Sequence, residues 1–426
     1  MPHGTGADRP RAAVVGSGVA GLTAAYLLQR AYDVTLYEAD DRLGGHAHSH
    51  DIAADDGPLV TLDSGFIVHN AHAYPGLLRL FGELGVGTRD SDMSMSVRCE
   101  GCGLEYAGSR GPHGLFPAAR SLARPEYLAM LAAIPAFYAG ARRLLRTPGQ
   151  DALTFGEFLA RGRYRRYFVS HFAVPLVAAV WSCPPADALG YPARYLFEFL
   201  GHHGMLSVGR SAGWRTVVGG SREYVERIAK QLTSVCCCMP VRAIRRVTGG
   251  VEIRTGDGGA SRFARVVVAT HPDQALRLLD PPTQAEREVL GAFRYSSSQV
   301  CLHTDARLLP GSPAARASWN YLLPGCAGTA GQVTVSYHLN RLMGLTGEAD
   351  YLVTLNAAGR VRPGRVLARM TYRHPLYTAG SVAAQRRLPS LNTPVIAYAG
   401  AYHGWGFHED GCRSGAEAAG ALGVRW

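Results

Sequence analysis

Lysine is almost absent from this sequence: of the 44 Lys and Arg residues, only Lys230 is a lysine. Long apolar runs are also absent. No stretch of about 18 apolar residues, the length that crosses a bilayer, occurs, so we expect no transmembrane helix. The first residues, MPHGTGADRPR, lack the apolar core of a signal peptide, which makes a cytoplasmic protein the expectation. The nine cysteines are an odd number at irregular spacing, a pattern that does not indicate a disulfide scaffold.

The composition is that of a basic, globular protein. With 426 residues, 47% hydrophobic and 18% charged, the chain is long enough for about two or three domains. The net charge of +11 comes from scattered arginines, which GC-rich codon usage explains; attraction to anionic lipid or to an acidic substrate is the alternative. No known nucleic-acid-binding module occurs, so we expect no nucleic-acid partner.

Residues 12–46 carry the strongest functional signal. An apolar run at 12–15 predicts a buried strand, residues 22–29 have helical periodicity, and residues 33–37 predict a second strand. This order of strand, glycine turn, helix and strand is typical of a Rossmann-like dinucleotide-binding unit. The glycines of the turn have G-x-G-x-x-G spacing and are Gly16, Gly18 and Gly21.

Each part of this turn has its own role in holding a dinucleotide. Gly16 permits the tight turn, Gly18 lets backbone N–H groups approach a pyrophosphate, and Gly21 lets the helix pack closely on the strand. The helix N-terminus adds partial positive charge near the phosphates. Glu38 ends the second strand, where its carboxylate can accept hydrogen bonds from ribose hydroxyls. The predicted cofactor contacts here are Gly16, Ser17, Gly18, Val19, Ala20, Gly21, Glu38 and Ala39.

The segment after Glu38 resembles a known family. Residues 39–45, A-D-D-R-L-G-G, are similar to the second fingerprint of the flavin-containing amine oxidase superfamily, which includes monoamine oxidases, protoporphyrinogen oxidase and phytoene desaturases. The resemblance places Arg42, Gly44 and Gly45 along the diphosphate of FAD, with His46 beside them. FAD is therefore the expected cofactor, and the acidic Glu38 fits its unphosphorylated ribose.

Later segments resemble further flavin-contacting parts of the superfamily. Residues 62–66 are similar to the strand that passes the flavin, the G-G pair at 219–220 to the turn where the chain re-enters the FAD domain, and residues 395–416 to the C-terminal flavin motif. In that motif a helix, expected here to begin near Asp410, aims its N-terminus at the flavin pyrimidine. The resemblance adds these cofactor contacts: Asp63, Ser64, Gly65, Phe66, Val241, Ala269, Gly400, Gly406, Phe407, His408 and Glu409.

One position departs from the superfamily pattern. Many relatives have an aspartate after the first glycine of the C-terminal motif, where Ala401 stands in this chain. The contact that this aspartate makes with the ribityl-phosphate region must then come from another side chain. His408, Glu409 and Asp410 are the expected replacements.

The fold expected from these patterns is α/β, with a Rossmann-like FAD-binding domain of the glutathione-reductase type and a discontinuous substrate domain. The resemblance assigns residues 10–65, 214–280 and 390–426 to the FAD-binding domain. It assigns residues 66–213 and 281–389 to the substrate-binding domain.

Two groups of residues have an alternative interpretation as metal ligands. His46, His48 and His50 alternate and would share one face of a strand, but a polar loop beside the cofactor is the favoured interpretation. Cys99 and Cys102 form a C-x-x-C pair of the kind that binds zinc or performs redox chemistry. No second pair at ligand spacing follows, so a hairpin turn is favoured and we expect no metal.

Residues 114–146 are rich in Ala, Leu, Tyr and Arg, and predict one or two amphipathic helices. Arginines flank the apolar positions at both ends. Such helices can lie on a membrane surface, which would make the protein a peripheral membrane protein. A helix pair packed on the core of the substrate domain is the favoured alternative.

The segments WRTVVGGSREYV, VSYHLNRL and GWGFHEDG are most similar to one bacterial subgroup of the superfamily. Its members commonly accompany fatty-acyl methyltransferases, so a methyltransferase is an expected partner. In amine-oxidising relatives a lysine of the substrate domain holds a water near flavin N5. Here Lys230 falls in the expected FAD-binding domain, and the substrate domain has none.

The resemblance therefore implies an FAD-dependent oxidoreductase that acts on a carbon skeleton by hydride transfer to flavin N5. Desaturation or isomerisation of a lipid-like acyl substrate is the favoured reaction, with Tyr337 and His338 as the expected catalytic residues. Two alternatives stay open. One is an FAD-dependent oxidase of a small amine or specialised metabolite, and the other is a non-catalytic FAD-binding partner of a methyltransferase.

Overall fold

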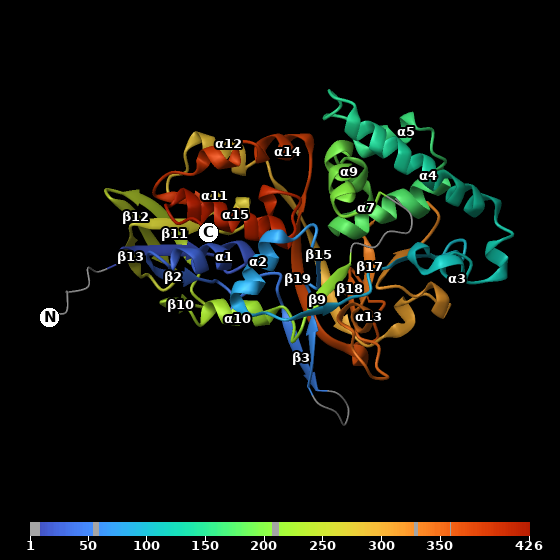
Figure 1. Cartoon of the computed structure of the whole chain (residues 1–426), viewed down its shortest axis with the longest axis horizontal. Helices are drawn as coiled ribbons and strands as arrows, with labels where there is room; N and C mark the ends of the chain where they lie inside the picture. Colours follow the sequence, from blue (N-terminus) through green and yellow to red (C-terminus); the bar gives the residue numbers. More distant parts are fainter. Residues whose placement is uncertain (1–8, 54–58, 207–212, 328–330, 358) are drawn as a thin grey trace.

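A five-stranded parallel sheet organises one half of the molecule in the computed structural model, which describes residues 9–53, 59–206, 213–327, 331–357 and 359–426 (Figure 1). The predicted α/β fold is confirmed, whereas the domain boundaries stay a prediction. Residues 1–8 of the segment examined for a signal peptide lie outside the described residues. In sheet order the strands are β10 (Ser234–Cys236), β2 (Asp33–Tyr37), β1 (Arg11–Val15), β14 (Arg265–Val268) and β20 (Ile396–Tyr398).

Both faces of this sheet are covered, which is why its strands read as continuous apolar runs. Successive side chains of β1 point to opposite faces. Ala12 and Val14 pack with the layer that contains α1, while Ala13 and Val15 pack with the layer beyond the other face. The first layer consists of α1 (Val19–Leu28), α2 (Pro75–Leu84), α10 (Arg222–Ala229) and α15 (His408–Ala421).

Small residues allow α1 and α15 to pack at very short range. A Cβ atom added at Gly415 would collide with the carbonyl oxygen of Ala20, and one added at Gly411 would lie 2.5 Å from Val19 Cγ1. The same holds within the glycine turn, where a Cβ atom at Gly21 would collide with the carbonyl oxygen of Gly16. The C-terminal helix is therefore joined to the first helix by contacts that a larger residue would break.

The opposite face of the parallel sheet is covered by an antiparallel meander and three helices. Apolar residues of the meander, among them Ile244 and Ile253, are fully buried against this face. The elements of this layer are β11 (Val241–Val247), β12 (Gly250–Thr255), β13 (Ala260–Phe263), α11 (Pro272–Leu278), α12 (Gln284–Leu290) and α14 (Ala379–Gln385).

A seven-stranded sheet and a group of helices form the other half of the molecule, on the right of Figure 1. In sheet order its strands are β19 (Val366–Leu376), β15 (Arg294–His303), β18 (Leu352–Leu355), β17 (Thr334–His338), β16 (Trp319–Leu323), β7 (Met95–Cys99) and β8 (Glu105–Ala107). Only β16 and β7 are parallel neighbours. The helices are α3 (Gly111–Leu115), α4 (Pro125–Arg146), α5 (Phe155–Arg161), α6 (Arg166–Phe168), α7 (Val174–Trp181), α8 (Pro185–Leu189) and α9 (Ala193–His202).

Short elements connect the two halves. Asp63 ends the β3–β4 hairpin and is fully buried, where it accepts hydrogen bonds from Ser49 Oγ (2.5 Å) and from the backbone N–H of Ser221 (2.9 Å). Burial raises the pKa of Asp63 to about 6, although these hydrogen bonds act in the opposite direction. The connecting elements are β3 (Ser49–Ala53), β4 (Leu59–Asp63), β5 (Val68–Asn70), β6 (Thr88–Asp90), β9 (Trp214–Val217) and α13 (Leu339–Met343).

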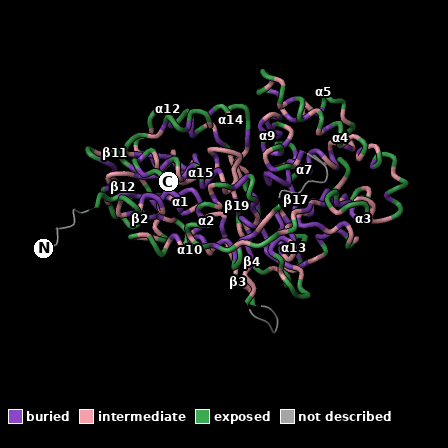
Figure 2. The backbone as a smooth tube through the Cα atoms, viewed as in Figure 1, coloured by how far each residue is buried: buried purple, intermediate pink, exposed green. Residues whose placement is uncertain are grey.

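Helix α4 has one buried side and one exposed side, as Figure 2 shows by its alternating colours. It is long and apolar enough to cross a membrane by length and composition alone, so the expectation that the chain has no transmembrane helix stays a prediction. Its 22 residues include several apolar side chains at helical spacing that pack on the core of the helical half. These are Tyr127, Met130, Phe137, Ala141 and Leu144.

We predict that the free energy of unfolding decreases as the pH falls, because of His303, which is fully buried on β15. Its Nε2 contacts Thr354 Oγ1 at 2.7 Å, and its Nδ1 accepts a hydrogen bond from the Asp305 N–H at 3.0 Å, so the ring is neutral. Burial lowers the pKa of His303 to about 4, against the smaller opposing effect of Asp305. The unfolded chain binds this proton near pH 6.5, so the stabilisation present above pH 6.5 is lost as the pH falls toward 4.

Urea unfolding between pH 7 and pH 4.5 tests this prediction, with His303→Gln as the comparison. The free energy of unfolding of the wild type should fall more steeply than that of the variant, by about 1.4 kcal/mol per pH unit below pH 6.5. Every other titrating group is common to the two proteins. Parallel pH profiles would contradict the assignment to His303.

Candidate active site

A cavity of about 710 Å³ runs between the two halves of the molecule. One end lies at the carboxyl edge of the parallel sheet, where Gly16, Gly18 and Glu38 line it. The other end lies against α7 and α9, where Trp181 and Phe199 line it. Ligands bind at this edge of open α/β sheets, so the position of the cavity agrees with the glycine-turn prediction.

The glycine turn has the geometry that a close phosphate contact needs. Gly16 has a φ of +99°, which favours glycine, and a Cβ atom there would lie 2.8 Å from the Ala269 carbonyl oxygen. Gly18 caps the N-terminus of α1 with a φ of −62°, and no atom lies within 4 Å of the position of its missing Cβ. The space beside Gly18 is therefore cavity, directly at a helix N-terminus.

Glu38 lies beside this turn at the end of β2. Its Oε2 accepts hydrogen bonds from Ser17, from the backbone N–H at 2.9 Å and from the hydroxyl, and its Oε1 accepts one from the Asp40 N–H at 3.0 Å. Gly44 N–H donates to the Ser17 carbonyl oxygen at 3.0 Å, which joins the two fingerprints. The carboxylate therefore has a fixed position at the cavity wall.

Four polar side chains line the cavity with a buried nitrogen that has no hydrogen-bond partner in the described chain. The atoms are Arg42 Nη1, His46 Nε2, His271 Nδ1 and His374 Nδ1. A buried polar atom without a partner costs about 1–3 kcal/mol. A ligand with several acceptors and negative charge would satisfy these atoms, and the diphosphate and polar ring edge of FAD supply both.

The histidines of this group are neutral. Burial lowers the pKa of His46 and of His271 to about 4, and the pKa of His374 to about 3. The positive charge of Arg42 lowers the pKa of His46 further, as a smaller cause. Arg42 thus supplies charge at this point of the wall, while the imidazoles supply neutral donors or acceptors.

His48 and His50 do not join His46 at the cavity. Their ring centroids are 4.0 Å apart, and they contact Tyr372 Oη at 2.9 Å and Ser64 Oγ at 2.8 Å respectively. Both side chains thus have partners within the chain, on β19 and directly after β4. This arrangement agrees with the polar segment beside the cofactor that we favoured over a metal site.

The C-terminal loop also reaches the cavity, and its helix starts near Asp410 as expected. Helix α15 begins at His408, and Gly400, Ala401, Gly406, Phe407 and His408 all line the cavity. The His408 ring stacks on Phe66 with centroids 3.7 Å apart. The helix N-terminus therefore lies at the cavity wall, as the flavin motif requires.

Of the three residues expected to replace the missing aspartate, only His408 lines the cavity. Both oxygens of Glu409 accept hydrogen bonds at 2.9 Å from the backbone N–H groups of Gly76 and Leu77, so Glu409 caps α2. Asp410 accepts a hydrogen bond from the Phe407 N–H and caps α15 itself. Helix capping by acidic side chains explains both positions.

Most of the other predicted contacts also line the cavity, and a few do not. Gly21, Gly44 and Asp63 hold the surrounding backbone in place through the contacts described above, without lining the cavity. The remaining predicted contacts that line it are Ser17, Val19, Ala20, Ala39, Gly45, Ser64, Gly65, Phe66, Val241 and Ala269.

Only one of the two expected catalytic residues lines the cavity. Tyr337 lines the cavity, with its hydroxyl 3.4 Å from Ser182 Oγ, whereas His338 does not line it, and its Nε2 lies 2.9 Å from Asp350 Oδ1. Neighbouring residues on a strand point to opposite faces, so both could not reach one site. The expectation that His338 lies near the flavin is therefore wrong.

Several cavity residues gave no signal in the sequence. His271 ends the segment after β14, His374 lies on β19, and Trp181 ends α7, but none belongs to a motif. Only the tertiary fold brings them to the glycine turn. The further lining residues that we did not predict include Tyr295, Arg373, Phe199, His203, Trp214 and Trp319.

Comparisons with known proteins agree with this geometry. Residues 19–325 match the model of the family described as flavin containing amine oxidoreductase. The chain is 39% identical over 109 residues to carotenoid phi-ring synthase of Streptomyces griseus, a match that spans 25% of this chain and 20% of that relative. The chain thus spans about a fifth of the length of this curated relative.

Solved structures resemble the chain over nearly its whole length. A putrescine oxidase variant is 15% identical with a TM-score of 0.68, over 98% of this chain and 99% of that one. A fatty acid isomerase from P. acnes that produces CLA is 19% identical with a TM-score of 0.65, over 96% and 98%. At these identities the likeness shows the fold alone.

The parallel sheet, the glycine turn and the cavity with unpaired polar atoms define an FAD-binding oxidoreductase. The chain belongs to the flavin containing amine oxidoreductase family, because the family model matches most of its length. The residues that line the cavity fit FAD: Gly18 and Arg42 would hold its diphosphate, Glu38 its ribose and His408 the flavin end. Bound there, FAD supplies a hydride acceptor.

We predict that Gly18→Val abolishes FAD binding without unfolding the protein. The φ of −62° is open to valine, and the added side chain would occupy the space beside the helix N-terminus where the diphosphate passes. Affinity for FAD should fall at least tenfold, or about 1.4 kcal/mol. Flavin absorbance after reconstitution and gel filtration measures the retained cofactor.

Gly82→Val is the matched control for this experiment. Gly82 is exposed on α2, and no atom lies within 4 Å of the position of its missing Cβ. This variant should retain FAD as the wild type does. Equal flavin content in Gly18→Val and Gly82→Val would remove the glycine turn from the cofactor site.

Proposed function

We propose that the protein is an FAD-dependent oxidoreductase that acts on the carbon skeleton of an elongated, lipid-like acyl substrate, by desaturation or isomerisation with hydride transfer to flavin N5. The observation that supports this most is the composition of the cavity end farthest from the glycine turn. It is apolar and aromatic, and its lining residues include Met93, Val180, Trp181, Phe199, Met205, Trp319 and Leu355.

The lining of this end offers no partner for a cationic substrate. The carboxylates among the described residues that line the cavity are Glu38 and Asp40, and both lie beside the glycine turn. Lys230, the sole lysine, lies 3.9 Å from Glu226 on the exposed side of α10, away from the lining residues. An ammonium group would lose its hydration here without a counterion, which is unfavourable, whereas an acyl chain loses nothing.

Tyr337 supplies a polar group at the apolar end. Burial raises the pKa of Tyr337 to about 12, so the phenol keeps its proton at neutral pH. Its hydroxyl lies 3.4 Å from Ser182 Oγ, and together they can orient a carbonyl or carboxylate oxygen of the substrate by hydrogen bonding. We assign Tyr337 this orienting role. Helices α7 and α9 exclude water from the same region.

An oxidase of a small amine is the second candidate. Aromatic faces attract cations with about 0.5–2 kcal/mol, and Trp181, Phe199 and Trp319 supply such faces. The fold is shared both with a putrescine oxidase and with a fatty acid isomerase. Fold similarity therefore favours neither reaction, and the absence of a lining carboxylate at this end favours the acyl substrate.

The route to the cavity supports a lipid substrate as well. Met205 lines the cavity, and the carbonyl oxygen of its neighbour Leu206 accepts a hydrogen bond from Arg142 Nη1 of α4 at 2.7 Å. The exposed side of α4 has no charged residue between Glu126 and Arg142. We propose that α4 rests on an anionic membrane surface from the cytoplasmic side, so that an acyl chain enters near Met205.

Anaerobic mixing with candidate compounds tests the substrate class. Acyl lipids or acyl thioesters should bleach the flavin absorbance of the holoenzyme, and simple primary amines should not. Reduction by amines alone would establish the second candidate. Absence of reduction by any compound of either kind would favour the non-catalytic partner of a methyltransferase.

A matched pair of variants tests whether the acyl chain binds in the cavity. Met205→Glu puts a carboxylate at the apolar end and should slow flavin reduction by the acyl compound at least tenfold, because burying an unpaired charge costs several kcal/mol. Met205→Leu keeps the apolar lining and should retain the wild-type rate. Equal rates of flavin reduction in the two variants would contradict binding of the acyl chain beside Met205.

Vesicle sedimentation tests the membrane contact. The Leu128 side chain is 40% exposed on α4, and Leu128→Glu should weaken binding to anionic vesicles about tenfold, because burying one leucine contributes about 1.5–3 kcal/mol. Leu367→Glu is the control, since Leu367 is a similarly exposed leucine on β19, at 37%. Wild-type protein that stays in the supernatant would exclude the contact.

A further inference from the structure

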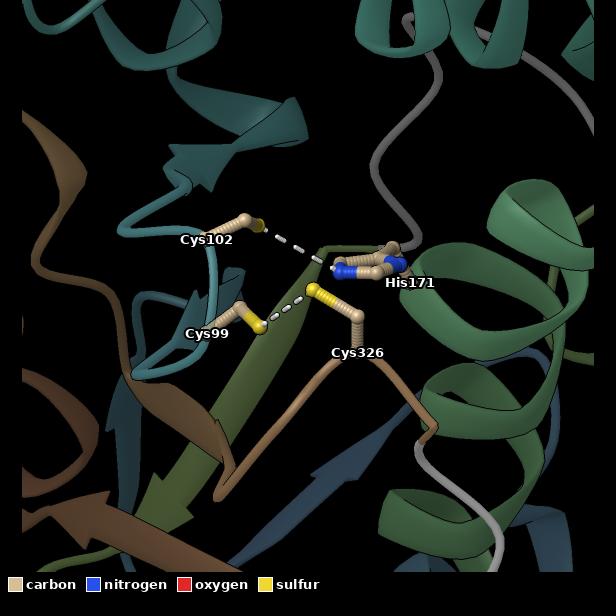
Figure 3. A group of neighbouring side chains, drawn as sticks. All are labelled: Cys99, Cys102, His171 and Cys326. Atoms are coloured by element: carbon tan, nitrogen blue, oxygen red, sulfur yellow. Dashed lines mark hydrogen bonds between the residues drawn. The ribbon is translucent and has the colours of Figure 1, made fainter.

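Four potential metal ligands from three separate segments meet outside the cavity (Figure 3). Cys99 ends β7, and Cys102 lies in the turn that leads to β8. His171 lies in a π-helical segment, Val169–Ala173, which runs directly into α7. Cys326 lies in the loop after β16, the strand beside β7. None of the four side chains lines the cavity.

The distances within this group match a tetrahedral site. Cys99 Sγ lies 3.8 Å from Cys326 Sγ, Cys102 Sγ lies 3.7 Å from His171 Nε2, and all four atoms lie within 4.8 Å of one another. Zinc–sulfur bonds of about 2.3 Å at tetrahedral angles separate two sulfurs by about 3.8 Å. The group therefore has the dimensions of a zinc site in the absence of the ion.

The turn that carries Cys99 and Cys102 holds both sulfurs on one side. Cys99 N–H donates to the Leu104 carbonyl oxygen at 2.8 Å, and Gly103 N–H donates to the Cys99 carbonyl oxygen at 2.9 Å. Gly103 has a φ of +65°, which favours glycine at this position. The hairpin turn expected from the sequence is thus present, and it presents two cysteines in one direction.

Neighbouring groups orient the other ligands. His171 Nδ1 lies 3.2 Å from the Tyr167 carbonyl oxygen, which can only accept, so Nδ1 carries the proton and Nε2 turns its lone pair toward Cys102. The Tyr167 hydroxyl lies 3.8 Å from Cys102 Sγ and can donate to a thiolate. Such outer partners of the ligands are characteristic of built metal sites.

We propose that Cys99, Cys102, His171 and Cys326 bind one zinc ion. Three cysteines and one histidine are a zinc ligand set, and soft thiolates disfavour magnesium, calcium and manganese. All four positions are filled by the protein, so the site is structural and leaves no position for substrate or water.

The ion would fix the apolar end of the cavity. His171 lies in the helical segment that ends at Trp181, and both Trp181 and Ser182 line the cavity. The cysteines lie at the end of β7, in the turn after it and in the loop after β16, and β7 and β16 are neighbouring strands of the seven-stranded sheet. A zinc ion would therefore join α7 to this sheet without contacting the flavin.

Metal analysis of the untagged protein, expressed with added zinc, tests the proposal. We expect about one zinc per chain and no stoichiometric iron. Cys102→Ser should reduce bound zinc at least tenfold, and Cys237→Ser, which alters an exposed cysteine outside the group, should leave it unchanged. A zinc content below one-tenth per chain, or equal zinc in both variants, would overturn the proposal.

Two further measurements use proteins that keep all four ligands, so their outcome does not depend on whether Cys102→Ser folds. Cobalt exchanged into the wild type should give the red absorption bands of a tetrahedral thiolate site, at longer wavelength than the flavin. Tyr167→Phe keeps all four ligands and should release zinc to a chelator about tenfold faster. Absence of these cobalt bands, or a disulfide between Cys99 and Cys326 in the purified protein, would overturn the proposal, whatever the flavin content.

Discussion

The rest of the structure depends on one constraint: the cavity wall contains buried polar atoms that have no hydrogen-bond partner among the described residues. Arg42, His46, His271 and His374 each have a buried nitrogen without a partner, and they come from three separate segments of the chain. A buried polar atom without a partner costs about 1–3 kcal/mol, and the acceptors of a bound dinucleotide would satisfy these four atoms. Bound FAD would therefore stabilise the folded chain, because it would complete hydrogen bonding that the chain begins.

The part of the site that the sequence could predict is the part built from consecutive residues. The glycine turn, Glu38 and Arg42 lie within one strand–helix–strand unit, so their spacing alone specifies their geometry. His271 reaches the same wall from the segment between β14 and α11, and His374 reaches it from β19. Nothing near either residue in the chain marks its role. Glu409 was predicted to contact the cofactor, but it caps α2. An acidic side chain at the start of one helix can cap a different helix.

The same distinction explains the cysteine group. The C-x-x-C pair was visible in the sequence, and its hairpin was predicted. The contacts of Cys102 with His171 and of Cys99 with Cys326 span 69 and 227 residues, respectively. A ligand set so dispersed has no spacing signature. The register of β7 beside β16 brings the cysteines together, and the helical segment Val169–Ala173 adds His171. Likewise His338 was expected beside Tyr337, although strand alternation separates them.

The order in which the sheet strands occur has a consequence for synthesis on the ribosome. Strand β20 and helix α15 close one edge of the site, yet they begin at residues 396 and 408, long after the glycine turn has been made. The surface of α1 that packs on Gly411 and Gly415 is covered only after α15 has been made. A nascent chain therefore exposes this apolar surface until residues 408–421 have been made, and chaperones that bind apolar segments would protect it during that time.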